Sequence, residues 1–236
     1  MSPDVFTLSE LARHLGRDSR EIERLANRGR IPGRKTEAGW IFHEREITQW
    51  LERELREYTD PELKALEESL QSEEVQSEVP VSSLLKPEMV QVPLEARTKR
   101  SVLEGLVEVA GRTWQIWEPA VVLAAVQERE EAMSTVFEDG IAIPHPRNPL
   151  PQCLGTSLVA FGRTLQGVPF GGPGGGLTTM FFLVLCRDSR THLQVLARLG
   201  RMFRQTEFLE RLRNAETSED AYQVICDADR EIGGES

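Results

Sequence analysis

The stretch Asp139-Gly-Ile-Ala-Ile-Pro-His-Pro-Arg147 is the most informative segment of the chain. The apolar run Gly140–Ile143 predicts a short buried strand that stops at Pro144 and carries His145 at its end. Prolines on both sides of His145 restrict the backbone and hold the imidazole in one place. A neutral imidazole in a fixed position suits a phosphoryl acceptor, because phosphoryl transfer depends on positioning and charge stabilisation. A structural histidine in a turn fits the same residues.

Strand and helix signals alternate around this segment, and their order predicts an α/β sandwich. Strands are expected at Met89–Leu94, Leu158–Phe161 and Thr178–Cys186, and helices at Thr98–Ala110, from Pro119 to Met133, at Thr191–Phe203, and near 206–213 and 218–228. The Gly-rich loop Gly167–Gly176 lacks the Lys and Ser/Thr of a nucleotide-binding P-loop. We expect it to be a flexible loop at the edge of the His145 site.

Residues 1–58 predict a separate small helical domain with a wing. Two helices begin at the capping-box sequences Thr7-Leu-Ser-Glu10 and Asp18-Ser-Arg-Glu21 and end at Gly16 and Gly29. A short hairpin is expected next, formed by Arg34-Lys-Thr36 and Trp40-Ile-Phe42. A third helix follows, and its apolar stripe consists of Ile47, Trp50, Leu51, Leu55 and Tyr58.

Residues 59–80 are expected to join this domain to a second one at 81–230. Pro61 starts another helix, in which Leu63, Leu66 and Leu70 form a thin apolar seam that is short for a dimer contact. The polar stretch Gln71–Glu78 predicts the linker itself, which ends at Pro80.

Composition predicts a cytoplasmic protein without a membrane-spanning segment. The longest apolar run, Met180–Cys186, is too short to cross a bilayer, the first residues do not form a secretory signal, and three scattered cysteines indicate reduced thiols. The net charge of −10 argues against general affinity for nucleic acid. Between Arg17 and Lys35, however, seven basic residues stand against three acidic ones.

Several separated motifs resemble the type-2 IIA proteins of the bacterial phosphotransferase system, the mannitol, fructose and nitrogen-regulatory kinds. They are Glu128-Arg-Glu130, Ser134-Thr135, Gly140-Ile-Ala-Ile-Pro-His145 and Thr191-His-Leu-Gln-Val-Leu196. The resemblance covers about residues 81–230 and implies a mixed sheet flanked by helices. It also implies that His145 takes a phosphoryl group from the small histidine phosphocarrier protein. The group then passes to a sugar-permease IIB component or acts as a regulatory switch.

The same resemblance assigns roles to four further residues. Arg129 would stabilise the phosphoryl group, and His192 would face His145 across the site. The hydroxyls of Ser134 and Thr135 would bind phosphoryl oxygens, although loops and helix ends use the same residues. A solvated helix face and a structural histidine are the alternatives for Arg129 and His192. The sequence departs from the family pattern at two places: Val136-Phe-Glu138 replaces a Gly-rich turn, and Pro146 replaces a Gly after the histidine. These departures put the choice of partner protein in doubt more than the role of His145 as acceptor.

The first domain resembles the excisionase/MerR-like helix–turn–helix family, through Leu8–Gly16, Gly29-Arg-Ile-Pro32 and Trp40-Ile-Phe42. On its second helix, Arg20, Arg24 and Arg28 lie opposite the apolar residues, which leaves a basic face free for a DNA major groove. Arg34 and Lys35 on the wing would contact the DNA backbone. A charged protein-docking face is the alternative. Specific binding would require a homodimer on paired half-sites.

The leading hypothesis is that a IIA-like domain senses carbohydrate or nitrogen status through His145 and that the helix–turn–helix applies this state to double-stranded DNA. Whether the chain counts as an enzyme is left open, since a phosphoryl carrier in sugar uptake with an N-terminal docking module is a second hypothesis. A pure interaction regulator without turnover is a third. No cofactor is expected, and no metal either, because the sequence offers no third or fourth ligand at recognisable spacing.

Overall fold

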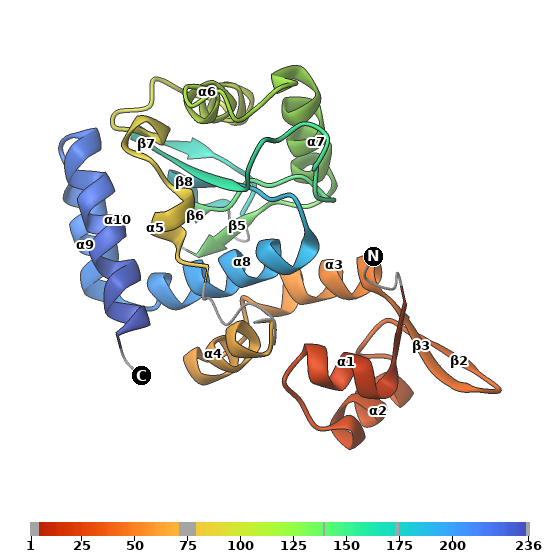
Figure 1. Ribbon diagram of the computed structural model, residues 1–236. Coiled ribbons are helices and arrows are strands. Elements are labelled where there is room, and N and C mark those ends of the chain that lie inside the picture. Colours follow the sequence, from red (N-terminus) through yellow and green to blue (C-terminus); the bar gives the residue numbers. More distant parts are fainter. Residues whose placement is uncertain (1–4, 71–78, 139, 173–174, 235–236) are drawn as a thin grey trace.

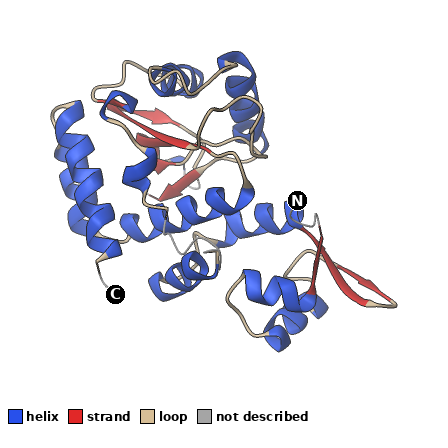
Figure 2. Cartoon of the chain, viewed as in Figure 1, coloured by secondary structure: helices blue, strands red, loops and turns tan. Residues whose placement is uncertain are grey.

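The structure is a computed structural model that describes residues 5–70, 79–138, 140–172 and 175–234. Figure 1 shows a small N-terminal unit beside a larger α/β unit, and Figure 2 shows that helices surround the sheet of the larger unit. In the described part of the chain, no helix is both long and apolar enough to cross a membrane. The predicted linker Gln71–Glu78 lies outside the described residues.

The N-terminal unit is a winged helix–turn–helix. A three-stranded antiparallel sheet has the order β1-β3-β2 and confirms the predicted wing hairpin. Its elements are β1 (Val5–Thr7), α1 (Leu8–His14), α2 (Ser19–Asn27), β2 (Arg34–Thr36), β3 (Gly39–His43) and α3 (Glu44–Glu54). The capping box predicted at Thr7 and Glu10 is present, and the Asp18 side chain caps α2. Strand β1 is an addition to the predicted elements, and α3 ends before the predicted Leu55 and Tyr58, which are nevertheless buried.

The larger unit is built on a five-stranded mixed sheet of order β4-β7-β8-β6-β5. β4 pairs in parallel with β7, and β6 pairs in parallel with β8. The β7–β8 and β5–β6 pairs are antiparallel. The strands are β4 (Val90–Gln91), β5 (Val136–Glu138), β6 (Ile141–Ala142), β7 (Leu158–Pro169) and β8 (Leu177–Leu185). The nearly continuous burial of β8 matches its apolar sequence.

Helices cover both faces of this sheet. In Figure 1, α6 and α7 lie on one face and α8 lies on the other, with α9 and α10 along one side. The helices are α5 (Val81–Leu84), α6 (Lys99–Gly111), α7 (Pro119–Ala132), α8 (Ser189–Phe203), α9 (Thr206–Asn214) and α10 (Ser218–Gly233), and a 3-10 turn spans Pro87–Met89. The α/β sandwich with a mixed sheet flanked by helices is confirmed.

Three predicted segments differ from the structure. The strand expected at Met89–Leu94 is limited to Val90–Gln91, because a 3-10 turn precedes it and Pro93 has no N–H for a ladder. The expected loop Gly167–Gly176 begins later, since β7 continues to Pro169. Val136–Glu138 forms strand β5, which was not among the predicted elements.

Helix α4 (Asp60–Ser69) packs against α8 and ties the two units together. Leu63, Leu66 and Leu70 are at most 1% exposed, and Leu63 lies 3.2 Å from the position that a Cβ on Gly200 would occupy. The predicted apolar seam is therefore covered within one chain, so it is not free for a dimer contact. Glu67, also on α4, is buried among arginines of α8.

His14, near the end of α1, makes stability depend on pH. Burial lowers the pKa of its imidazole from 6.5 to about 4, with a smaller contribution from Arg190 on α8. Below about pH 6.5 the His14 imidazole binds a proton in the unfolded chain but not in the folded chain. The free energy of unfolding should therefore fall between pH 6.5 and 4, by at most about 3 kcal/mol from this group.

Denaturant unfolding at pH 7 and pH 4.5 checks this expectation. The His14→Gln variant carries no titrating group at the position, so it should lose less stability between the two pH values than the wild type. Equal losses in the two proteins would contradict the role given to His14.

Candidate functional site

Backbone hydrogen bonds hold the two residues that precede His145. The Ile143 N–H donates to the Thr135 carbonyl at 3.0 Å, and the Val184 N–H of β8 donates to the Pro144 carbonyl at 2.9 Å. Pro144 thus lies in a segment that is paired with the sheet, as the sequence predicted for the end of a strand. The imidazole itself is 4% exposed.

The ring of His145 has a defined tautomer. Its Nδ1 lies 2.7 Å from the Ile143 carbonyl oxygen. A carbonyl only accepts hydrogen bonds, so Nδ1 carries the proton and donates it. Burial lowers the pKa of His145, against an opposing effect of Glu52, so the ring is neutral at neutral pH. The lone pair is then on Nε2, which is buried and has no hydrogen bond within the described structure.

His192 and Arg129 come from two other elements and meet His145. His192 lies in the first turn of α8, whose N-terminus is capped by Asp188, and its ring centroid is 5.0 Å from that of His145. Arg129 lies near the C-terminus of α7 and donates from Nη1 to the Met133 carbonyl at 2.9 Å. Both side chains are buried. The structure therefore brings together the three residues that the sequence placed at the centre of the site.

The two hydroxyls expected to bind the phosphoryl group are engaged elsewhere. Ser134 Oγ donates to the Phe170 carbonyl at 3.1 Å, and Thr135 Oγ1 donates to Glu130 Oε2 at 2.5 Å. Glu130 also accepts from the Thr135 N–H and from Lys99. In this arrangement, Thr135 and Glu130 fix the start of β5, and a role for either hydroxyl in binding phosphate stays a prediction.

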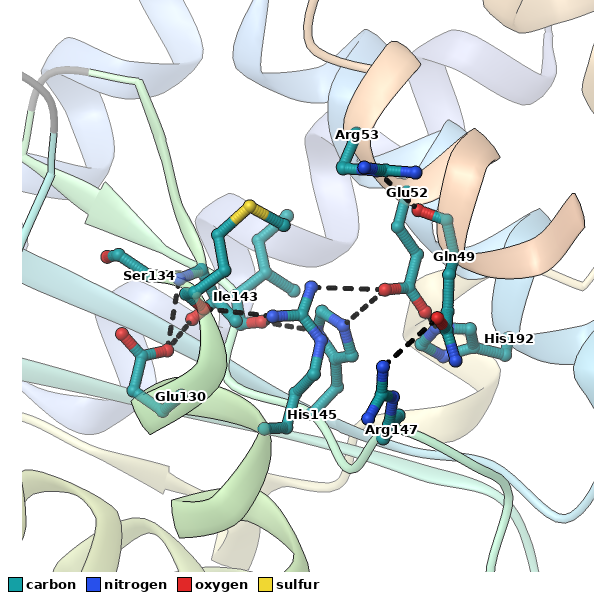
Figure 3. Close-up of polar contacts among 12 residues, drawn as sticks. Gln49, Glu52, Arg53, Glu130, Ser134, Ile143, His145, Arg147 and His192 are labelled. Carbon is teal, nitrogen blue, oxygen red and sulfur yellow. Dashed lines mark hydrogen bonds and ion pairs between the residues drawn. The ribbon is translucent and has the colours of Figure 1, made fainter. Parts of the chain in front are cut away.

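Glu52 is a site residue that sequence reasoning missed. It is on α3 of the helix–turn–helix unit, and its carboxylate points between the two histidines (Figure 3). Oε1 lies 3.0 Å from His192 Nε2, while Oε2 lies 3.1 Å from Arg129 Nη2 and 3.3 Å from His145 Nε2. The side chain of Glu52 is only 3% exposed.

The carboxylate of Glu52 is ionised in this setting. Burial by itself would raise the pKa of Glu52, but its contacts with the imidazoles of His145 and His192 lower it below the usual value. The guanidinium of Arg129 is a further cationic partner at 3.1 Å. A buried anion is tolerated only when it is paired in this way.

Neighbouring contacts hold α3 and the segment after it over the site. Arg147 Nη2 donates to Gln49 Oε1 at 3.2 Å, and Arg56 Nη2 donates to the Ser134 carbonyl at 2.9 Å. Arg204, just after α8, donates to the Tyr58 carbonyl. The cavity that remains beside Glu52 and His145 has a volume of about 20 Å³, which is room for little more than a water molecule.

Glu52, His145 and His192 are also residue types that hold metals. One ligand atom from each lies within 4.8 Å of the others. Two histidines and one carboxylate leave a fourth position open, as in catalytic zinc sites. The sequence shows no third ligand at recognisable spacing because Glu52 belongs to the other domain. Arg129 already supplies a positive charge to the same carboxylate, so the anion has a partner without a metal.

The basic face predicted on α2 is present. Arg20, Arg24 and Arg28 are exposed, whereas Ile22 and Ala26 are buried and Leu25 is partly buried. Arg34 and Lys35 are exposed on the wing, where Lys35 lies over the ring of Trp40. None of these five cations forms an ion pair with another described residue. In Figure 1 the wing projects away from the α/β unit.

Comparison with known proteins assigns both units. Residues 83–228 match the family model of the phosphoenolpyruvate-dependent sugar phosphotransferase system EIIA 2, and residues 5–54 match a helix–turn–helix domain. A nitrogen regulatory protein of Pseudomonas aeruginosa is 28% identical over 154 residues, which cover 62% of this chain and 95% of that protein. A fructose-specific EIIABC component of Bacillus subtilis is 25% identical over 152 residues, which cover 64% of this chain. That match spans only 24% of the Bacillus protein.

Solved structures show the same fold. The nitrogen regulatory protein IIA-Ntr from Neisseria meningitidis has a TM-score of 0.56 at 24% identity and covers 61% of this chain and 98% of its own. IIA mannitol from Escherichia coli has a TM-score of 0.52 at 20% identity, and it covers 59% of this chain and 97% of its own. The family model spans more than half of the chain, and the chain therefore belongs to the EIIA type-2 family of the phosphoenolpyruvate-dependent sugar phosphotransferase system, with a helix–turn–helix domain in front of it.

Proposed function

We propose that the chain is a cytoplasmic IIA-like regulator that accepts a phosphoryl group on His145 Nε2 and transmits this state to DNA through its helix–turn–helix. The observation that carries the proposal is the fixed proton on Nδ1, which leaves the lone pair of Nε2 directed into a cluster with Arg129 and His192. A neutral nitrogen nucleophile beside a guanidinium is what transfer of an anionic phosphoryl group requires.

The donor in this proposal is the small histidine phosphocarrier protein. The nitrogen regulatory relatives support a regulatory use, because they match this chain over most of their own length. A solved complex of the Escherichia coli mannitol IIA with phosphorylated IIB shows that another member of the fold assembles with a IIB component. A sugar-permease IIB component is therefore the alternative acceptor, and the N-terminal domain would then be a docking module.

The DNA part of the proposal rests on the exposed face of Arg20, Arg24 and Arg28, with Arg34 and Lys35 beside it on the wing. The acidic net charge of the whole chain makes this local basic surface the natural place for phosphate contacts. The binding partner is double-stranded DNA, and a homodimer would be needed to bind two half-sites.

Phosphoryl labelling tests the proposal. Incubation with radiolabelled phosphoenolpyruvate, enzyme I and the histidine phosphocarrier protein should label the wild type, whereas His145→Ala should take up no label. His43→Ala, a change of an exposed histidine in the first domain, should label like the wild type. Because Glu52 contacts the acceptor, each variant should also be tested in a Glu52→Gln background. Equal labelling with and without His145 would end the acceptor assignment.

A further inference from the structure

The carboxylate of Glu52 lies where a phosphoryl group on His145 would have to be. Its Oε2 is 3.3 Å from His145 Nε2, the nitrogen that carries the lone pair (Figure 3). A phosphorus atom bonded to Nε2, together with its oxygens, would need the volume that this carboxylate fills. The remaining space of about 20 Å³ does not hold both groups.

The donors of the site are directed at Glu52 as they would be at phosphate. Arg129 Nη2 and His192 Nε2 lie 3.1 and 3.0 Å from the two carboxylate oxygens. Planar guanidinium and imidazole donors bind carboxylate and phosphate oxygens with similar geometry. The carboxylate therefore satisfies the anion-binding groups of the site with a group from the chain's own first domain.

We propose that the helix–turn–helix domain is an intramolecular competitor of the phosphoryl donor, with Glu52 as a phosphoryl mimic, so that docking of α3 and phosphorylation of His145 exclude each other. This inference rests on the proposed function of His145 and adds its regulation. The docked form protects the acceptor, and a form with α3 displaced receives the phosphoryl group.

The transfer step shows why α3 must leave. The bond between phosphorus and the donor's histidine nitrogen breaks while a bond from phosphorus to His145 Nε2 forms. Nδ1 keeps its proton, which stays hydrogen-bonded to the Ile143 carbonyl oxygen. In-line transfer needs the donor's imidazole on the open side of Nε2. Glu52, Leu55 and Arg56 line that cavity, so the donor's imidazole and α3 compete for one position.

The product state disfavours re-docking through charge. A phosphoryl group adds about −2 at neutral pH, and it would take the Arg129 and His192 donors that hold Glu52. The ionised carboxylate would then be unpaired next to an anion, which is costly in a buried site. The contacts Gln49–Arg147 and Arg56–Ser134 belong to the same docked surface and would be lost with it.

Helix α4 stays attached to α8 and so keeps the displaced N-terminal domain next to the α/β unit. Glu67 is 3% exposed and pairs at 2.6 and 2.9 Å with Arg198 and Arg201, which follow His192 by six and nine residues on α8. These ion pairs do not involve the phosphoryl site, so α4 stays on α8 while α3 moves. Phosphorylation then changes the orientation of the basic face on α2 and leaves the exposure of that face unchanged.

Chemical modification of His145 tests the competition without any phosphotransferase component. Diethyl pyrocarbonate reacts with accessible neutral imidazoles, and peptide mass spectrometry measures its rate at each histidine. Relative to the wild type, Glu52→Ala and Glu52→Gln should raise the rate at His145 at least about tenfold, equivalent to about 1.4 kcal/mol in the opening equilibrium. Glu46→Gln, an exposed change on the same helix, should leave the rate unaltered.

Each outcome decides one point. A raised rate at His145 in the Glu52 variants, with the rate at His43 unchanged, supports the competitor. An unchanged rate in a folded Glu52→Gln protein overturns it. An increase in the wild type on adding EDTA, to the level of Glu52→Gln, would also overturn it, because a metal would then hold the site closed. If Glu52→Ala fails to fold, Glu52→Gln alone provides the comparison.

Phosphorylation separates this inference from the proposed function. If His145 is labelled, Glu52→Gln should accelerate labelling relative to Glu46→Gln, and hydrogen exchange of the α3 amides should become faster in the phosphorylated wild type. Labelling at equal rates in the two variants overturns the competitor but leaves the acceptor standing. Opening in the modification assay with no labelling of any variant would overturn the proposed function and leave the occlusion by Glu52 intact.

Discussion

Replacing Arg198 by alanine is expected to lower the free energy of unfolding by about 3–5 kcal/mol, because it takes the cationic partner from buried Asp229 and one of the two arginines that pair with buried Glu67. Arg198 is 2% exposed, and it donates to Asp229 Oδ1 at 2.5 Å and to Glu67 Oε1 at 2.6 Å. Burial alone would lower the pKa of Arg198, but Asp229 and Glu67 raise it, so the group stays charged. The loss removes a charge and also side-chain volume from the joint between α4, α8 and α10.

Urea denaturation followed by circular dichroism measures this effect. Arg230→Ala is the matched control, because Arg230 is on α10 too but is 72% exposed and pairs only at the surface with Asp227. Its cost should be below about 1 kcal/mol. Comparable midpoints for the Arg198 and Arg230 variants would show that the buried network does not join the helices.

The double variant Arg24→Ala/Arg28→Ala should bind DNA much more weakly than the wild type. Both side chains are exposed and lie one helical turn apart, Arg24 in α2 and Arg28 at its C-cap. An arginine that contacts a base or phosphate contributes about 1–3 kcal/mol, so a loss of about 10-fold or more in affinity is expected for each. The slope of log affinity against log salt should also fall, by about 1 for each phosphate contact removed.

Fluorescence anisotropy with the duplex upstream of the protein's own gene, at two salt concentrations, provides the measurement. Arg100→Ala/Arg230→Ala is the matched control, since it removes the same charge from exposed positions on α6 and α10. The control should retain the affinity and the salt slope of the wild type. If both double variants weaken binding equally, the contribution is general charge and the α2 face does not read DNA.

Much of the fold could be predicted because the local sequence signals, capping residues and apolar runs, specify the same elements that the hydrophobic core buries. The capping-box sequences placed the starts of α1 and α2 near Thr7 and Asp18, and the apolar run before Cys186 predicted β8. Short edge strands were harder. β5 covers three residues and carries little alternation, so its pairing with β6 depends on the sheet around it.

The site likewise contains residues that the sequence could predict and one that it could not. His145, His192 and Arg129 lie in motifs with a characteristic spacing, so the sequence alone was enough to group them. Glu52 has no such signal, because it stands on an acidic helix among Glu44, Glu46 and Glu54. Its burial results from the docking of two units, and its partner His192 is 140 positions away in the chain. Helical periodicity cannot show a second buried face of this kind.

The close packing of α4 on Gly200 has a practical consequence for dissecting the molecule. A fragment that begins at residue 81, near the start of the family match, would leave Arg198 and Arg201 without Glu67 and would remove Leu63 from its place against Gly200. A fragment that begins at Thr59 keeps the capping box of α4 and this whole contact, while it omits Glu52. We therefore expect a fragment that begins at Thr59 to be more stable than one that begins at residue 81, and to have His145 uncovered.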